Sequence, residues 1–280
     1  MQGRPERPEV PPPRGGRASA PRAGSQGGEA TITRALDFLN RRGKGWACRL
    51  IQLTGKASHP IHPKHLIEQP RAWFLDRLKA GDHVLDLGCG TGSHGLAAAT
   101  VAHVTFCDKA FVRATAIWFP GPCVQADLEA PLPFEDRSFD AVLMLDVLEH
   151  LDNRVQAILE VQRILTPAGL LFLAVPNAET AWRRRLRQAG LFPFSDPDHR
   201  MEYSRKQLVG FLDLAGFQIQ SIAPVAALDT PWAGLIDLVG GLHLPTYRRL
   251  VAWKRRRALE NPEESTGFLV VARPRRNGIP

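Results

Sequence analysis

One stretch of nine residues limits what this chain can fold into more than any other part: residues 84–92 read Val-Leu-Asp-Leu-Gly-Cys-Gly-Thr-Gly. A short apolar run around an aspartate is followed by three alternating glycines and then by a helix-forming stretch with alanine at residues 97–99. This pattern predicts a buried strand that turns sharply into a helix. Glycine lacks a Cβ, so the turn can take positive φ and a ligand can come close to the backbone and to the unpaired N–H groups of the helix start. A strand, a glycine-rich turn and a helix form the nucleotide-binding start of a doubly wound α/β fold.

Apolar runs and amphipathic stretches alternate along the rest of the chain. Further strands are expected at residues 101–107, 123–126, 139–145, 170–175, 217–222 and 267–272. Helices are expected at residues 30–55, 71–79 and 152–165, the last of them ended by Thr-Pro-Ala-Gly at 166–169. We therefore predict an α/β fold: a doubly wound, Rossmann-like, seven-stranded and mostly parallel sheet, with helices on both faces and a helical insertion before the last strand.

The composition divides the chain into five parts. Residues 1–29 are rich in Pro, Gly and Arg and hold almost no large apolar side chains, which predicts a disordered tail. Residues 30–80 are expected to form a helical N-terminal cap, and residues 81–224 the core that binds a cofactor. Residues 225–265 form a helical insertion in this prediction, and residues 266–280 form the last strand and a basic tail.

The net charge of +8 is concentrated at the two ends of the chain. Residues 1–34 carry six arginines against three glutamates, and residues 240–280 carry eight arginines and one lysine against three glutamates. Basic ends suit an anionic partner such as a membrane surface or nucleic acid, or they are simply solvated. The chain has no run of 18 apolar residues, and its four cysteines lack metal-site spacing. We therefore expect no transmembrane helix and reduced thiols in a cytoplasmic protein.

Several segments carry a resemblance to a known family. Residues 86–92 resemble the first motif of class I S-adenosylmethionine-dependent methyltransferases, in which an acidic residue stands two places before the first glycine. Residues 90–95 also fit the dinucleotide pattern G-x-G-x-x-G, but a pyrophosphate ligand would not favour that carboxylate. Residues 139–151 resemble the family's fourth-strand motif, and residues 164–171 are similar to its usual Leu-Lys-Pro-Gly-Gly connection. Residues 196–217 resemble the branch that methylates small molecules and lipid-linked metabolites, such as the ubiquinone-pathway O-methyltransferases.

The resemblance implies S-adenosyl-L-methionine as the cofactor and assigns its contacts. The carboxylate of Asp86 would hold the ammonium group, and the loop glycines would line the methionine and ribose parts. Asp108 ends the second strand, where doubly wound folds place an acidic residue on the ribose hydroxyls. Asp127 and Leu128 follow the third strand and would contact the adenine amino group and ring face. The expected cofactor-binding residues are Asp86, Gly88, Gly90, Gly92, Asp108, Asp127, Leu128 and Asp146.

Two histidines are candidate catalytic bases. His150 directly follows the fourth strand, and His199 lies in an Asp-Pro-Asp-His loop after the fifth. A methyl transfer to a hydroxyl needs a base that takes the proton. Each histidine also has a plainer interpretation, His150 as a backbone hydrogen-bonding partner and His199 as a surface loop residue.

Two groups of residues raise the question of a metal. Asp146, Glu149 and His150 resemble an acidic-x-x-Glu-His run that can hold a divalent cation in ubiquinone-pathway enzymes. The same Glu-His pair also occurs without metal, so no metal is expected. Three histidines at 59, 62 and 65 are separated by prolines that impose extended backbone, with no cysteine or carboxylate adjacent. They are interpreted as part of the segment leading into the core.

Two helical regions are expected outside the core. A helix over residues 30–55, with Ile32, Leu39 and Trp46 among its apolar residues, would cover the cofactor site, as such helices often do in this family. Residues 231–257 join an apolar segment to a run of arginines. They fit either a lid over the active site or an interfacial pair of helices on an anionic membrane.

The sequence thus predicts an S-adenosylmethionine-dependent methyltransferase acting on a small or lipid-linked metabolite, with oxygen as the acceptor atom. The alternatives are methylation of carbon or nitrogen, methylation of RNA or protein, and a non-catalytic scaffold that only binds the cofactor. Nucleic acid is disfavoured as a partner because no basic platform with interleaved aromatic residues is visible. The expected location is the cytoplasm, with peripheral attachment to the inner face of the membrane as a variant.

Overall fold

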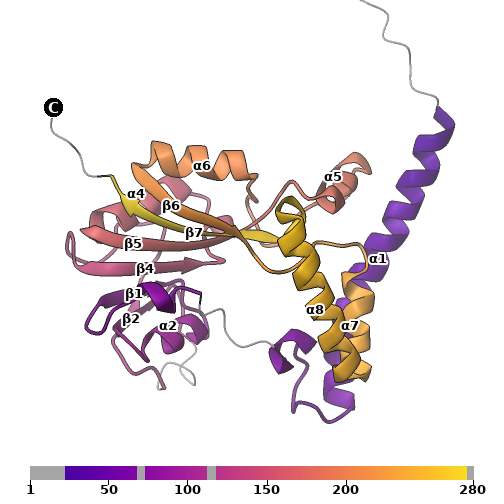
Figure 1. The fold of residues 1–280 in the computed structure, drawn as a ribbon, viewed down its shortest axis with the longest axis horizontal. Helices are drawn as coiled ribbons and strands as arrows, with labels where there is room; N and C mark the ends of the chain where they lie inside the picture. The colour runs from indigo at the N-terminus through magenta and orange to yellow at the C-terminus, as the bar shows by residue number, and fades with distance from the viewer. Residues whose placement is uncertain (1–22, 68–72, 112–117, 276–280) are drawn as a thin grey trace, which may run out of the picture.

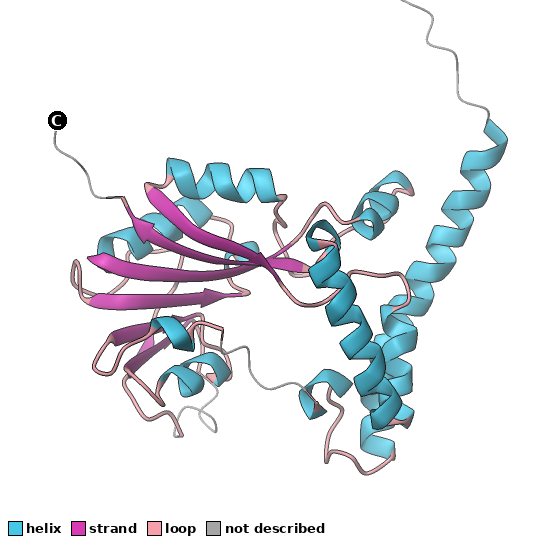
Figure 2. Cartoon of the chain, viewed as in Figure 1, coloured by secondary structure: helices cyan, strands magenta, loops and turns pink. Residues whose placement is uncertain are grey.

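A single seven-stranded sheet forms the centre of the protein. The computed structural model describes residues 23–67, 73–111 and 118–275. The strand order is β3-β2-β1-β4-β5-β7-β6, in which β5–β7 and β7–β6 pair antiparallel and the other neighbours pair parallel (Figures 1 and 2). The strands are β1 (His83–Leu87), β2 (His103–Asp108), β3 (Cys123–Gln125), β4 (Phe139–Leu145), β5 (Leu165–Pro176), β6 (Phe217–Pro224) and β7 (Gly267–Pro274). The predicted Rossmann-like fold is confirmed.

Helices cover both faces of this sheet, and a separate group stands at one end of it (Figure 1). The α-helices are α1 (Ala23–Leu53), α2 (Ser93–Ala98), α4 (Arg154–Ile164), α5 (Ala181–Gln188), α6 (Arg205–Leu214), α7 (Ala233–Leu242) and α8 (Leu244–Glu260). Short 3-10 helices are η1 (Pro63–Leu66), η2 (Leu75–Arg77), η3 (Leu148–His150) and η4 (Pro262–Glu264). None of these helices is long and apolar enough to cross a membrane.

The central strand β4 explains why both faces must be covered. Its side chains alternate between two buried clusters, with Val142 and Met144 on one face and Leu143 and Leu145 on the other. The first face packs against α4 and α6, and the second against α2 and the segment before β1. Apart from Asp140, every residue of β4 is apolar, so neither face of the strand is suited to water and helices are required on both sides.

Three local predictions were wrong. The expected helix at 71–79 is only the short η2 turn in its described part, and residues 166–169 belong to the start of β5. The helix α1 begins at Ala23, within the predicted disordered tail; the rest of that tail, residues 1–22, lies outside the described residues. Glycines in residues 23–29 weaken a helix locally, but extending an existing helix adds one hydrogen bond per residue without a new nucleation step.

The covered face of α1 consists largely of small and polar residues, together with Ile51. Its buried positions include Thr33, Asn40, Gly43 and Ala47. Its main partner is α7 and not the sheet, and the predicted cover over the cofactor site stays a prediction. The large apolar side chains left exposed on α1 are Ile32, Phe38, Leu39, Trp46 and Leu53.

Small residues explain this contact between α1 and α7. The N–H of Gly234 donates to Asn40 Oδ1 at 2.7 Å. A Cβ on Gly234 would lie 2.1 Å from the Asn40 carbonyl oxygen, and one on Gly241 would lie 3.1 Å from that of Ala47. The two helices run parallel, because the later residue of α1 meets the later residue of α7. The absence of side chains at these glycines therefore allows the two backbones to approach closely.

Candidate functional site

The glycine-rich loop connects β1 to α2 at the carboxyl end of the parallel strands. Gly88, Gly90 and Gly92 have φ values of 75°, 52° and 74°, in the left-handed region that favours glycine. A Cβ on Gly88 would press on Val147, and one on Gly92 would press on the ring of Phe119. A Cβ on Gly90 would meet nothing within 4 Å, so the loop is open at its middle. This opening over Gly90 fits a ligand that lies against the backbone, as the predicted cofactor would.

Asp86 lies beneath this loop. Its Oδ2 accepts a hydrogen bond of 2.8 Å from the N–H of Gly95, in the first turn of α2, and the residue is only 3% exposed. Burial raises the pKa of the Asp86 carboxyl to about 7; the N–H of Gly95 lowers it, and the charge of Asp108 adds to the rise. The carboxylate therefore fixes the start of α2, and its predicted contact with an ammonium group stays a prediction.

Asp108 stands at the tip of β2, beside the open part of the loop. Its Oδ2 accepts from the N–H of Gly90 at 2.8 Å, and its Oδ1 accepts from the N–H of Ala110 at 3.1 Å. A carboxylate offers about four lone-pair sites. Two sites therefore remain for the pair of hydroxyl donors that the sequence assigns to this residue.

The next residues along the same edge are Asp127 and Leu128. Asp127 Oδ1 accepts from the N–H of Glu129 at 3.1 Å, and Oδ2 lies 3.1 Å from Nζ of Lys109. The hydrogen bond from Glu129 and then the one from Lys109 lower the pKa of Asp127. Leu128 is buried in the larger core cluster. Lys109 was not singled out from the sequence, although it directly follows Asp108.

Asp146 follows the last residue of β4 and is exposed. Its φ of 58° is left-handed, which is uncommon for a residue other than glycine. The N–H of Asp146 donates to the carbonyl of Ala174 at 3.0 Å, which ties this turn to β5. The next residue, Val147, is the one that contacts Gly88, so Asp146 lies close to the glycine-rich loop.

The two candidate catalytic histidines meet at the end of β4. The ring centroids of His150 and His199 are 4.6 Å apart and the rings are nearly perpendicular. His199 Nδ1 lies 2.8 Å from Oε1 of Glu202, and its side chain is 8% exposed, whereas His150 is exposed. The structure thus brings together two residues that are 49 positions apart in the sequence.

Glu202 is a site residue that the sequence reasoning missed. Its Oε1 also accepts from the N–H and the Oγ of Ser195, at 2.5 and 2.6 Å. Burial alone would raise the pKa of Glu202, but the hydrogen bond from His199, the charge of Arg183 and the bonds from Ser195 together lower it. A buried carboxylate thus stays charged beside His199. The only sequence signal was an acidic residue three positions after His199.

One group among the described residues could hold a metal ion: Glu149, His150 and His199 offer ligand atoms that lie within 4.8 Å of one another. Asp146, the first residue of the sequence run considered for a metal, is not in this group. Carboxylate and imidazole ligands suit several divalent cations.

The histidines at 59, 62 and 65 do not gather as ligands. His62 Nε2 lies 3.0 Å from Oδ2 of Asp237, and the hydroxyl of Tyr247 donates to Asp237 Oδ1 at 3.1 Å. This network joins η1 to α7 and α8. His62 therefore has a structural partner, as expected for a segment that only leads into the core.

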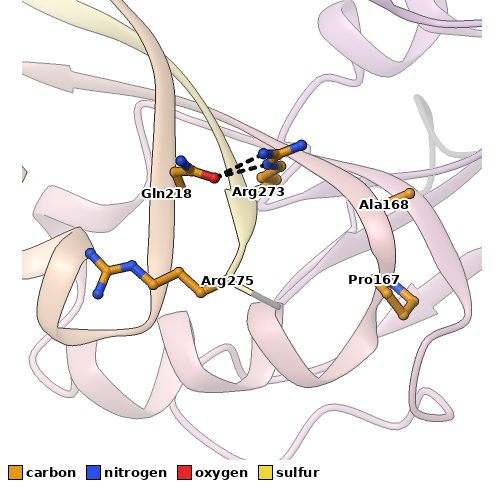
Figure 3. A pocket seen from close by; sticks show the side chains of 5 residues that line it. All are labelled: Pro167, Ala168, Gln218, Arg273 and Arg275. Atoms are coloured by element: carbon orange, nitrogen blue, oxygen red, sulfur yellow. Dashed lines mark hydrogen bonds between the residues drawn. The ribbon is translucent and has the colours of Figure 1, made fainter. Parts of the chain in front are cut away.

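A surface hollow at the opposite end of the sheet does not belong to this site. It is lined by Pro167, Ala168, Gln218, Arg273 and Arg275 (Figure 3). Arg273 Nε and Nη2 donate to Gln218 Oε1 at 3.1 and 2.9 Å, which fills part of the hollow with an internal contact. These residues lie at the start of β5 and β6 and the end of β7, away from the carboxyl ends where ligands bind in open α/β sheets.

Comparison with known proteins agrees with this geometry. A family model described as "Methyltransferase domain" matches residues 61–222. A probable tRNA methyltransferase 9B of Mus musculus is 33% identical over 45% of this chain and 30% of its own length. A 27-O-demethylrifamycin SV methyltransferase of Amycolatopsis mediterranei is 28% identical over 64% of this chain and 89% of its own length.

A probable S-adenosylmethionine-dependent methyltransferase of Mycolicibacterium smegmatis is 31% identical over 56% of this chain and 62% of its own length. The chain thus spans less than two thirds of the curated relatives it matches first.

Solved structures share the fold. The [4+2]-cyclase SpnF matches with a TM-score of 0.54 and 20% identity over 88% of this chain and 97% of its own. The methyltransferase bound to the activator Trm112 of Haloferax volcanii matches with a TM-score of 0.53 and 19% identity over 84% of this chain and 98% of its own. At these identities the likeness concerns the fold alone.

Proposed function

Because this chain belongs to the methyltransferase domain family, a class I fold whose cofactor is S-adenosylmethionine, we propose that it transfers the cofactor's methyl group to an oxygen atom of a small or lipid-linked metabolite. The observation that supports this proposal is the pair of histidines at the end of β4, backed by the buried Glu202. A pair of this kind can accept a proton from a hydroxyl.

The two histidines have different parts in this proposal. Bound S-adenosylmethionine supplies a methyl group that is already activated by its sulfonium, so the protein has to align the acceptor and keep water away. His150 is the exposed ring, so it is the base that takes the proton from the acceptor hydroxyl. His199 is a positioning residue: with Nδ1 hydrogen-bonded to Glu202, it packs its ring against that of His150.

The loop residues hold the other partner. In this proposal Asp108 binds the ribose hydroxyls, Asp127 and Leu128 bind the adenine end, and Asp86 lies near the ammonium group. The left-handed turn at Asp146 places the end of β4 between the loop and the histidines. Methyl donor and acceptor would therefore meet above the carboxyl ends of β1 and β4.

RNA is the second candidate acceptor, and it is favoured by the relatives named as probable tRNA methyltransferases. Carbon or nitrogen acceptors and a scaffold that binds the cofactor without turnover are further alternatives, since the fold alone does not establish the reaction. The pair of histidines, which can accept a proton, favours a hydroxyl group as the methyl acceptor.

The experiment uses the full chain and cofactor labelled on the methyl group. Calorimetry should show binding of S-adenosylmethionine and S-adenosylhomocysteine but not of NAD. Incubation with phenolic and hydroxylated metabolites, with a lipid extract and with bulk tRNA should place the label in the organic-extractable products. Label in tRNA would replace the proposal with the RNA candidate, and binding without any transfer would support the scaffold.

A chelator should leave the rate unchanged, since the proposed base needs no metal; loss of activity would assign a metal to the Glu149, His150 and His199 group.

The raised pKa of Asp86 leads to a prediction for the pH dependence of cofactor binding. Without cofactor, the pKa of about 7 leaves the carboxyl largely protonated at pH 6. A nearby ammonium group favours the charged form and lowers this pKa, so binding should release a proton below pH 7. Affinity should rise roughly tenfold from pH 5.5 to 6.5 and level off above about 7.5.

Calorimetry in two buffers of different ionisation enthalpy measures this proton release. Asp86→Asn keeps an oxygen acceptor for the N–H of Gly95 and should make the affinity independent of pH in this range. If the affinity of the wild-type protein for the cofactor is constant from pH 5.5 to 8, cofactor binding does not change the protonation of Asp86.

A further inference from the structure

The helix α1 carries an apolar stripe that nothing in the described residues covers. It consists of Ile32, Leu39, Trp46 and Leu53, which are between 44 and 81% exposed. Each residue follows the one before it by seven positions, which is close to two full helical turns. The four side chains therefore lie in one row along the helix. A row of this length on a soluble surface marks a contact with another apolar surface.

The neighbouring helix α7 adds a second row. Trp232, just before its first residue, and Leu235 and Leu242 within it are 51, 37 and 63% exposed. Their spacing of three and seven positions places them on one face of the helix. The buried residues Gly234 and Gly241, which contact α1, lie one position before Leu235 and Leu242.

The two rows face the same side of the helix pair. On α1, Leu39 and Trp46 each precede by one position the residues that contact α7, namely Asn40 and Ala47. On α7, the exposed leucines follow the contact residues by one position. In two parallel helices that face each other, the residue before a contact position on one helix and the residue after a contact position on the other lie on the same side of the pair. The rows, called here the α1–α7 face, therefore form one continuous apolar surface.

The charges along the middle of the α1–α7 face are basic. Arg42 lies between Leu39 and Trp46, three residues after one and four before the other, and Arg49 lies likewise between Trp46 and Leu53. Both arginines are exposed, and the Arg42 guanidinium lies 5.4 Å from the centroid of the Phe38 ring.

One acidic residue borders the face, the exposed Glu29 three positions before Ile32 at the start of the row. The other acidic residues of α1 and α7 are Asp37, which pairs with Arg41, and Asp237, which is buried against His62. An apolar row with aromatic residues and flanking arginines has the composition of an interfacial membrane helix.

A second copy of the chain fits this face less well. The seven-residue spacing would place Ile32, Leu39, Trp46 and Leu53 at one core position of a coiled coil. Arg42 and Arg49 would then occupy the other core position, where their guanidinium groups would be buried against arginines of the copy. Anionic headgroups would neutralise the same charges. The chain's own residues 1–22 offer only Met1 and Val10 as large apolar side chains, too few to cover the stripe.

We propose that the α1–α7 face docks the protein on an anionic membrane surface. This goes beyond the proposed methyl transfer and does not depend on it. The structure also divides the segment 231–257 that the sequence suggested as an anchor. Tyr247 of α8 packs on Gly240 and bonds to Asp237, which lie on the side of α7 opposite to Leu235 and Leu242. The apolar residues of α7 belong to the face, and α8 lies behind it.

Sedimentation with vesicles tests the proposal, using the full chain with phosphatidylcholine vesicles that contain or lack 30% phosphatidylglycerol. The wild-type protein should sediment with the anionic vesicles at low salt and be released at high salt. Trp46→Glu, and separately the double change Arg42→Glu with Arg49→Glu, should weaken binding at least tenfold. The matched control is Arg255→Glu with Arg256→Glu on α8, which makes the same charge change behind the face and should bind within threefold of wild type.

Cofactor affinity and melting temperature of each variant show whether it is folded, and neither should change, because these side chains are exposed. The proposal fails if the wild-type protein stays in the supernatant with anionic vesicles at low salt, or if the α8 change alone abolishes binding. It also fails if sedimentation equilibrium shows a dimer that Trp46→Glu dissociates, because the occupant would then be a second copy. None of these results bears on methyl transfer, which is measured separately on soluble acceptors.

Discussion

Replacing His150 with alanine should lower kcat by about 10²–10⁴ while leaving the dissociation constant of S-adenosylmethionine unchanged. The reason is that His150 is the exposed ring of the pair at the end of β4 and is proposed to take the proton from the acceptor hydroxyl. Its backbone N–H donates to the carbonyl of Val147, a bond that alanine keeps. The measurement is the steady-state rate with a methylated acceptor, together with calorimetry of the cofactor.

The exposure of His150 allows a sharper test. Added imidazole should restore part of the rate of His150→Ala, because the vacated space opens to solvent. Imidazole should restore less of the rate of His199→Ala, because that side chain is 8% exposed and held by Glu202. His103→Ala, at the start of β2 and far from the carboxyl ends, serves as the control and should keep the wild-type rate. A His150→Ala rate within threefold of wild type would remove His150 from the mechanism.

Glu202 supports the same mechanism through its hydrogen bond to His199. Glu202→Gln removes the charge but keeps the size, and it should lower kcat with little change in KM, because in the proposed mechanism Glu202 affects the base through His199 and does not touch the substrate. If the variant has a lower melting temperature and both KM and kcat change, the role of Glu202 is purely structural.

Replacing Asp108 with alanine should weaken S-adenosylmethionine binding by about 2–4 kcal/mol, or roughly 30- to 1,000-fold. Two charge-assisted bonds to the ribose hydroxyls would be lost. The structure adds a second reason, because the same carboxylate accepts from the N–H groups of Gly90 and Ala110 and so fixes the loop.

Asp108→Asn separates these two effects. The amide oxygen can still accept from the N–H of Gly90, so the loop should hold, but one acceptor for the ribose is lost, and the affinity should fall between wild type and alanine. Asp127→Ala, whose ion pair with Lys109 is exposed, should weaken binding less than Asp108→Ala. Calorimetry at one pH and salt concentration compares the three. An unchanged affinity in Asp108→Ala would exclude this residue from the cofactor site.

The sequence was most informative where the determinants are local. The bounds of β4 follow from a run that is apolar except at Asp140, and the turn after β1 follows from glycines that alone take left-handed φ easily. Asp86 was chosen because residues 86–92 resemble the family's first motif, and Asp108 because strand ends of a parallel sheet meet at one edge. The site histidines were chosen in the same way, one by one.

Their arrangement depended on contacts far apart in sequence. His150 and His199 meet only because the backbone N–H groups of Arg200 and Met201 donate to the carbonyl of Glu149, which places the later loop beside the end of β4. Glu202 enters the site through the same loop. The sequence gives no sign of this pairing, since the partners share no periodicity.

The sequence by itself determined the sheet, the cofactor loop and the family, because strand burial and glycine backbone conformation are set within a few neighbouring residues. Only the tertiary structure decided which side of α1 is covered. Several of its large apolar side chains are exposed, whereas Gly43, Asn40 and Ala47 let the backbone of α7 approach, and two glycines of α7 complete the contact. That choice depends on two surfaces 194 residues apart fitting each other, and it leaves Leu39 and Trp46 facing outward.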